Sequence, residues 1–204
     1  MTDAGQRLRF APQLPADWDR ATVRRVAAGA SRVDFAVERA AGRMTVTATA
    51  VAGAMPALAL APALPLDARV QSVRVDGADA RFRARPEGDV QRIEIDVPKA
   101  ASATRHVVLT YEEGTDVFTH IELPEAGSVS EGLRVLRARV EGGALRLLVE
   151  GRGGQTYRVG VRTQRHLNAV AGVTVTPAPR GAEIRIAFDG ANGYVRRSIV
   201  LPLN

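Results

Sequence analysis

Apolar and polar residues alternate along several separate stretches of this chain. In one of them, Val33, Phe35 and Val37 are separated by polar or small residues. The same alternation recurs at residues 92–97, 106–111, 157–162 and 183–188. Successive side chains of a β-strand point to opposite faces, so each stretch predicts a strand with one buried and one solvated face. This pattern favours antiparallel sheets, because parallel sheets are usually covered on both faces.

The gaps between these stretches contain residues that accept a positive φ angle. The pairs Asp76-Gly77, Gly142-Gly143 and Gly153-Gly154 are typical of tight turns, and so is the segment 189–193. About a dozen strands follow one another at spacings near ten residues, which is typical of sandwiches and barrels. We therefore predict an all-β fold, an antiparallel β-sandwich made of two packed sandwich units.

Helical patterns are weak in this sequence. The segment from Asp17 to Ala28 is compatible with a short helix that has Trp18 and Val26 as apolar contacts. The β-branched Thr22 and Val23 disfavour a longer one. Strands and helices do not alternate along the chain, so a Rossmann-like fold is not expected.

A domain boundary is expected at residue 114. A strong strand pattern ends at Tyr111, and a polar segment containing glycine and proline separates it from the next apolar hairpin near Leu133. We therefore predict two β-sandwich units, at residues 1–114 and 115–204. A single larger sandwich is the alternative.

The charge and composition of the chain exclude several functional classes. It has 28 basic and 22 acidic residues, and all but one of the basic residues are arginines, as expected from a GC-rich genome. No run of five like charges occurs and aromatic residues make up 4%, which argues against nucleic-acid binding. The absence of cysteine excludes disulfides, thiolate nucleophiles and cysteine metal sites.

The sequence also lacks the segments that direct a protein to or across a membrane. No stretch reaches the roughly 18 uncharged apolar residues of a membrane-spanning helix, so no membrane partner is expected. The first residues lack the apolar core of a signal peptide. If the chain is intact, it is not expected to be secreted by the usual route, and its compartment stays open.

Acidic residues gather near the predicted boundary, with His120 among them. They are Glu112, Glu113, Asp116, Glu122 and Glu125. Paired carboxylates can act as general acid and base, so a β-sandwich hydrolase that uses this 112–125 cluster is one hypothesis. A solvated loop is the simpler interpretation. The sequence has no G-x-S-x-G motif and no metal-ligand spacing of histidines, so we expect no catalytic residue, metal or cofactor.

Two aromatic residues are the candidates for ligand binding. Tyr111 and Tyr157 are in phase with predicted core positions, whereas Trp18 and Tyr194 are not. An exposed Trp or Tyr ring can stack on a sugar ring, although the neighbouring Leu14 suggests that Trp18 packs against the domain edge.

The segment from Leu8 to Trp18 has the form L-x-F-x-P-x-L-P-x-x-W. Together with the strand at residues 32–39 and the strand-turn at residues 64–77, it resembles the region after the catalytic barrel of six-hairpin glycoside hydrolases. These are the (α/α)6-barrel enzymes, such as amylo-α-1,6-glucosidase-like and glucoamylase-like proteins. The resemblance covers about residues 8–112 and implies the C-terminal β-sandwich of such an enzyme.

This resemblance implies an accessory role and transfers no catalytic residue, because the catalytic carboxylates of that family belong to a helical barrel that is missing here. We therefore expect a non-catalytic accessory domain that packs against a catalytic glycosidase module or contacts carbohydrate. Ala57, Leu58 and Leu60, in the uncharged segment 50–66, are the candidates for an exposed packing patch. That segment is otherwise read as a buried edge strand bounded by prolines. A carbohydrate-binding module acting alone, with Trp18 and Tyr194 exposed to solvent, is the alternative.

Overall fold

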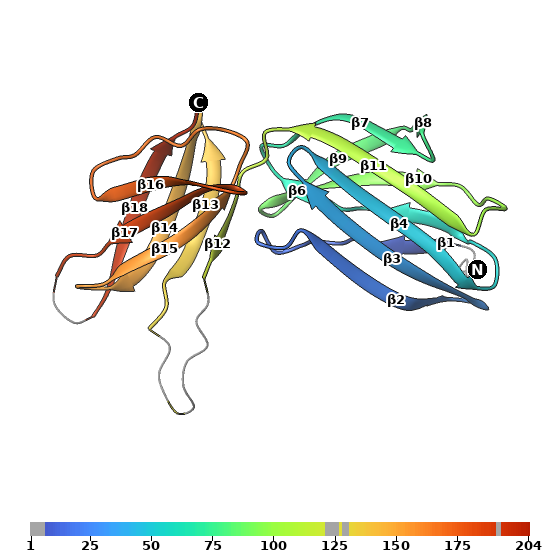
Figure 1. Cartoon of the computed structure of the whole chain (residues 1–204), viewed down its shortest axis with the longest axis horizontal. Coiled ribbons are helices and arrows are strands. Elements are labelled where there is room, and N and C mark those ends of the chain that lie inside the picture. The colour runs from blue at the N-terminus through green and yellow to red at the C-terminus, as the bar shows by residue number, and fades with distance from the viewer. Residues whose placement is uncertain (1–6, 121–126, 128–130, 191–192) are drawn as a thin grey trace. The chain divides into compact units, whose positions relative to one another are not determined.

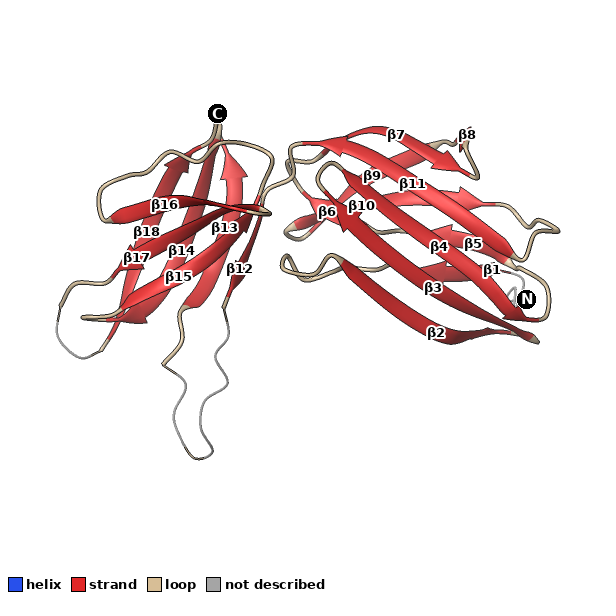
Figure 2. Ribbon diagram, viewed as in Figure 1, coloured by secondary structure: helices blue, strands red, loops and turns tan. Residues whose placement is uncertain are grey.

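The computed structural model describes residues 7–120, 127, 131–190 and 193–204. These residues form β-strands and no helices (Figure 2), which confirms the predicted all-β class. The segment from Asp17 to Ala28, whose sequence is compatible with a short helix, is not helical. Strand β2 (Arg20–Ala28) occupies that segment, and its β-branched Thr22 and Val23 favour an extended chain.

The chain divides into two compact units, Met1–Gly114 and Thr115–Asn204. Each unit has two sheets and its own apolar core.

The described residues of the N-terminal unit form eleven strands, which Figure 1 draws in blue to yellow-green. Besides β2, they are β1 (Arg7–Phe10), β3 (Ser31–Ala40), β4 (Arg43–Ala52), β5 (Ala57–Leu60), β6 (Ala63–Pro65), β7 (Arg69–Val75), β8 (Ala78–Asp79), β9 (Phe82–Glu87), β10 (Val90–Val97) and β11 (Thr104–Glu112). One sheet has the order β2-β3-β4-β11-β7-β8. In the other, β10 pairs with β5 and β6 along one edge and with β9 along the other, and β1 pairs with β5. All pairings are antiparallel except that of β1 with β5.

The core of the N-terminal unit lies between its two sheets. The predicted alternation holds, because Val33, Phe35 and Val37 of β3 are all buried. The Phe35 ring stacks on Phe10 of the opposite sheet, with ring centroids 4.0 Å apart. The six-stranded sheet therefore faces the sheet of β1, β5, β6, β9 and β10 through an apolar layer, as in a β-sandwich.

Ala57, Leu58 and Leu60, which were predicted to form an exposed apolar patch, do not form one. Leu58 and Leu60 are only 1% and 2% exposed and belong to the core, while Ala57 is half-buried. Strand β5 also lies between β1 and β10 rather than at an edge, because β1 covers its outer side. The other interpretation, a buried edge strand bounded by prolines, is correct about the burial of the two leucines. It is wrong about the edge, because β5 has a neighbour on both sides.

The part of the C-terminal unit that the structure describes forms the remaining seven strands: β12 (Asp116–Thr119), β13 (Arg134–Glu141), β14 (Ala144–Arg152), β15 (Thr156–Arg162), β16 (Val173–Ala178), β17 (Gly181–Ala187) and β18 (Tyr194–Pro202). They form one sheet of order β12-β15-β17-β16 and another of order β13-β14-β18, all antiparallel. The core between them includes Val149, Val159 and Ile184, none of which exposes any surface.

Candidate functional site

Trp18 and Tyr194, the two aromatic residues predicted to bind ligand, are both exposed. Trp18 exposes 50% of its surface and follows the turn at Ala16 and Asp17 that leads into β2. Tyr194 exposes 39% at the start of β18, and the guanidinium carbon of Arg134 lies 4.3 Å from its ring centroid. The two side chains belong to different units.

A buried arginine fastens the turn that carries Trp18. Arg39, at the end of β3, is 7% exposed. Its Nη2 donates to the backbone carbonyls of Pro15 (2.7 Å), Ala16 (3.0 Å) and Trp18 (3.1 Å). The backbone N–H of Arg39 also donates to the carbonyl of Asp19, at 2.7 Å. Carbonyl oxygens thus replace the water that a guanidinium loses on burial, and residues 15–19, here called the Trp18 turn, are held against β3.

Asp19, the residue after Trp18, lines a polar groove of about 560 Å³. Its remaining lining residues are Arg20, Glu38, Arg39, Ala40, Arg43 and Thr45. Arg20, Glu38 and Thr45 are neighbours across β2, β3 and β4, because Glu38 pairs in register with both of the others. The groove thus offers carboxylates, guanidiniums and a hydroxyl, which together can accept from and donate to the hydroxyl groups of a ligand.

Arg39 is not among the site residues predicted from the sequence, although the sequence contains a signal for it. Val33, Phe35 and Val37 define the inward face of β3, and Arg39 continues the same phase. Gln91 likewise precedes Ile93 in the inward phase of β10, and its Nε2 donates to the carbonyls of Pro65 and Ala68. A polar residue at an inward position near a strand end therefore marks a side chain that binds the backbone of a neighbouring loop.

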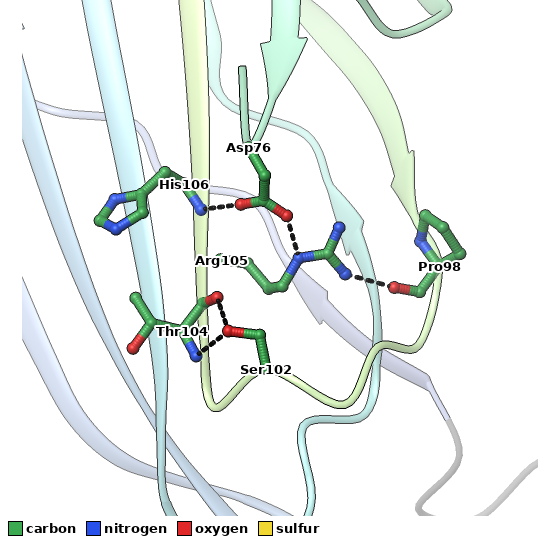
Figure 3. Close-up of polar contacts among 6 residues, drawn as sticks. All are labelled: Asp76, Pro98, Ser102, Thr104, Arg105 and His106. Atoms are coloured by element: carbon green, nitrogen blue, oxygen red, sulfur yellow. Dashed lines mark hydrogen bonds and ion pairs between the residues drawn. The ribbon is translucent and has the colours of Figure 1, made fainter. Parts of the chain in front are cut away.

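Arg105 is a third inward polar residue, and it organises the cluster in Figure 3. Its Nε donates to the Asp76 carboxylate at 2.6 Å, and its Nη1 donates to the carbonyl of Pro98 at 2.5 Å. Asp76 has a φ of 52°, in the tight turn predicted at Asp76-Gly77, and its other carboxylate oxygen accepts from the backbone N–H of His106 at 2.8 Å. The cluster connects the turn between β7 and β8 to the start of β11.

The Asp76 carboxylate has a lowered pKa. Desolvation alone would raise this pKa, but the hydrogen bonds from the His106 N–H and the Arg105 guanidinium, together with the positive charge of Arg105, bring it below its ordinary value. All the partners in this cluster stabilise the ionised form of Asp76. We therefore assign Asp76 a structural role, which is to hold the turn between β7 and β8.

Described members of the acidic cluster contact groups outside the cluster or the neighbouring backbone. Glu113 forms an ion pair with Arg69 at 3.0 Å, and Asp116 accepts from the N–H of Val117. His120 lies 3.8 Å from Glu183, which is outside the cluster.

The acidic cluster has three further members. Glu112 is exposed, and Glu122 and Glu125 lie outside the described residues. The described members of the cluster are not among the residues that line the groove beside the Trp18 turn. Among the described residues, no group of three or more His, Asp or Glu side chains could hold a metal ion.

The arginines of the C-terminal unit do not form one stripe. Arg139 lies opposite Arg146 in the sheet of β13, β14 and β18, whereas Arg158 belongs to the other sheet. Carboxylates also separate them. Glu150 lies within 3.1 Å of Arg134 and 3.4 Å of Arg196.

No family model, curated protein or solved structure matches this chain. Among the described residues, the structure contains no helix of the length and apolarity needed to span a membrane.

Proposed function

We propose that this chain is a non-catalytic β-sandwich accessory region associated with carbohydrate-active enzymes, and that the Trp18 turn is its contact with carbohydrate. The single observation that carries the proposal is the exposed Trp18 on a turn held by Arg39. The resemblance of residues 8–18 to the segment after the barrel of six-hairpin glycoside hydrolases supports the same assignment.

The Trp18 turn is preorganised for binding. An indole ring offers a flat apolar face to the C–H groups of a sugar ring. Because Arg39 already holds the backbone of Trp18, binding costs little further ordering of the chain. The groove beginning at Asp19 supplies the polar groups that sugar hydroxyls need.

Packing against a catalytic module is the second candidate function for the same turn. Tryptophan and arginine are enriched at the centres of protein interfaces, and Arg20 and Arg43 line the adjacent groove. The patch at Ala57, Leu58 and Leu60 no longer supports this candidate, because its two leucines are buried. Carbohydrate contact is therefore the better supported of the two.

A glycan array probed with the whole chain, followed by calorimetric titration of the best ligand, tests the proposal. We expect Trp18→Ala to weaken binding at least about tenfold, equivalent to roughly 1.4 kcal/mol. Val23→Ala is the matched control, because Val23 is also exposed and lies on the adjacent strand. Tyr194→Ala shows whether the aromatic residue of the C-terminal unit contributes.

The proposal fails if no glycan binds to a chain whose circular dichroism shows intact sheets. It also fails if Trp18→Ala binds as tightly as the unmodified chain. Packing against a catalytic module would then be the candidate to test.

A further inference from the structure

A second groove, separate from the Trp18 turn, lies on the N-terminal unit. Its volume is about 1040 Å³, and strands β1, β5, β9 and β10, which belong to one sheet and are labelled in Figure 2, contribute most of its lining. Ala59 of β5 pairs in register with Arg9 on one side and with Asp96 on the other. Since alanine is small, the taller side chains of the neighbouring strands form the walls around it.

The walls of this groove carry an excess of positive charge. The lining includes five arginines and two carboxylates: Arg7, Arg9, Arg81, Arg83, Arg85, Glu94 and Asp96. Arg7 forms an ion pair with Asp96. The guanidinium groups of the other four arginines form no hydrogen bond or ion pair with any residue that the structure describes.

The arginines of β9 are regularly spaced. Arg83 and Arg85 lie on the same face of β9, and Arg81 immediately precedes the strand in the same alternation. Alternate residues of a strand are about 6.8 Å apart, so Arg83 and Arg85 are spaced by about that distance along β9, and Arg81 lines the same groove just before the strand begins. A row of unpaired cations along a groove is complementary to a linear polyanion.

The remaining lining distinguishes between classes of polyanion. Glu94 and Asp96 would repel a ligand that carries only negative charges, but they can accept hydrogen bonds from hydroxyl groups. Ala59, which pairs in register with Asp96, offers a small apolar contact. A chain of sugar acids has carboxylates, hydroxyls and C–H faces together, whereas an acidic peptide lacks the hydroxyls.

We propose that this groove binds a carboxylated polysaccharide, with Arg81, Arg83 and Arg85 pairing with successive carboxylates. A guanidinium can bind a carboxylate through two parallel hydrogen bonds, which makes arginine suited to this ligand. Because the arginines are exposed, salt screens the attraction, and binding weakens steeply between about 0.05 and 1 M salt.

Calorimetric titration of the whole chain with oligogalacturonate tests this site. We expect the double variant Arg83→Gln, Arg85→Gln to bind roughly tenfold more weakly. The matched control, Arg24→Gln with Arg137→Gln, removes the same charge from exposed positions outside the groove and should bind like the unmodified chain. Fully methyl-esterified oligogalacturonate keeps the hydroxyls without the charge and should bind weakly.

Three results would overturn the inference: no binding of oligogalacturonate, equal loss in both double variants, or equal affinity for polyglutamate of the same length. These results are distinguishable from failure of the proposed function, because Trp18→Ala leaves the arginine groove intact. Loss of neutral-glycan binding in Trp18→Ala and loss of oligogalacturonate binding in the β9 variant are therefore independent readouts.

Discussion

Replacing Arg39 with methionine tests whether this one side chain holds the Trp18 turn. The substitution keeps an unbranched side chain but removes the guanidinium that contacts the carbonyls of Pro15, Ala16 and Trp18. The contact with Ala16 is buried, whereas those with Pro15 and Trp18 are partly buried and can be replaced by water. Leaving one buried carbonyl without a donor costs about 1–3 kcal/mol, so we expect a loss of about 2 kcal/mol.

Urea unfolding followed by circular dichroism measures this loss. For a unit of this size, about 2 kcal/mol corresponds to a midpoint lower by roughly 1 M urea. Trp18 is the only tryptophan, so its fluorescence anisotropy in the folded chain reports the turn directly and should fall. Arg39→Lys keeps the positive charge but lacks the planar guanidinium. Its urea midpoint and its Trp18 anisotropy should lie between those of the unmodified chain and those of Arg39→Met.

Arg24→Met is the control for Arg39→Met, since Arg24 is exposed on β2. An exposed substitution of this kind changes stability by no more than about 0.5 kcal/mol. The reasoning is refuted if Arg39→Met unfolds at the same urea concentration as the unmodified chain and its Trp18 anisotropy is unchanged. It is equally refuted if Arg24→Met lowers the midpoint as much.

Two further predictions concern glycine packing and pH. A Cβ atom on Gly160 would lie 2.1 Å from the Phe118 ring, so Gly160→Ala should destabilise by about 1–3 kcal/mol in urea unfolding. The effect should shrink in a Phe118→Ala background, and full additivity of the two changes would contradict the packing argument. Because the folded pKa of Asp76 is lowered, its ionisation stabilises the fold above the unfolded pKa of about 3.9, and this contribution is lost as pH falls through the folded value. Asp76→Asn should therefore destabilise the chain at pH 7 and less so near pH 2, whereas an equal effect at both pH values would exclude the ionised carboxylate as the cause.

The groove beside the Trp18 turn and the arginine groove of β9 depend on strand pairing, which is not visible in the sequence. Arg83 and Arg85 are recognisable as residues of one strand face from their spacing. Their position relative to Arg9 depends on β1 pairing with β5, and on β5 and β9 pairing with opposite edges of β10. Arg83 and Arg85 thus line one surface with Arg9, which lies 74 and 76 positions earlier in the chain, and no local pattern specifies that pairing.

The error at Ala57–Leu60 has a related cause. An uncharged run of alanine and leucine has no alternation of polarity, so it cannot show which face is buried or how many neighbours the strand has. Pairing with β1 on one side and β10 on the other places Leu58 and Leu60 in the core. From composition alone, the segment was compatible with an exposed patch or with a buried edge strand, and neither interpretation included pairing on both sides.

The sequence by itself determined the all-β class, the inward faces of the alternating strands and tight turns such as Asp76-Gly77, because side-chain direction and φ preference are local properties. The tertiary structure alone decided the partners of each strand and the surfaces that those partners create. Arg39 shows the division. Its inward phase is local information, but the carbonyls that it binds are contributed by residues 21–24 positions earlier, which only the folded chain brings to its guanidinium.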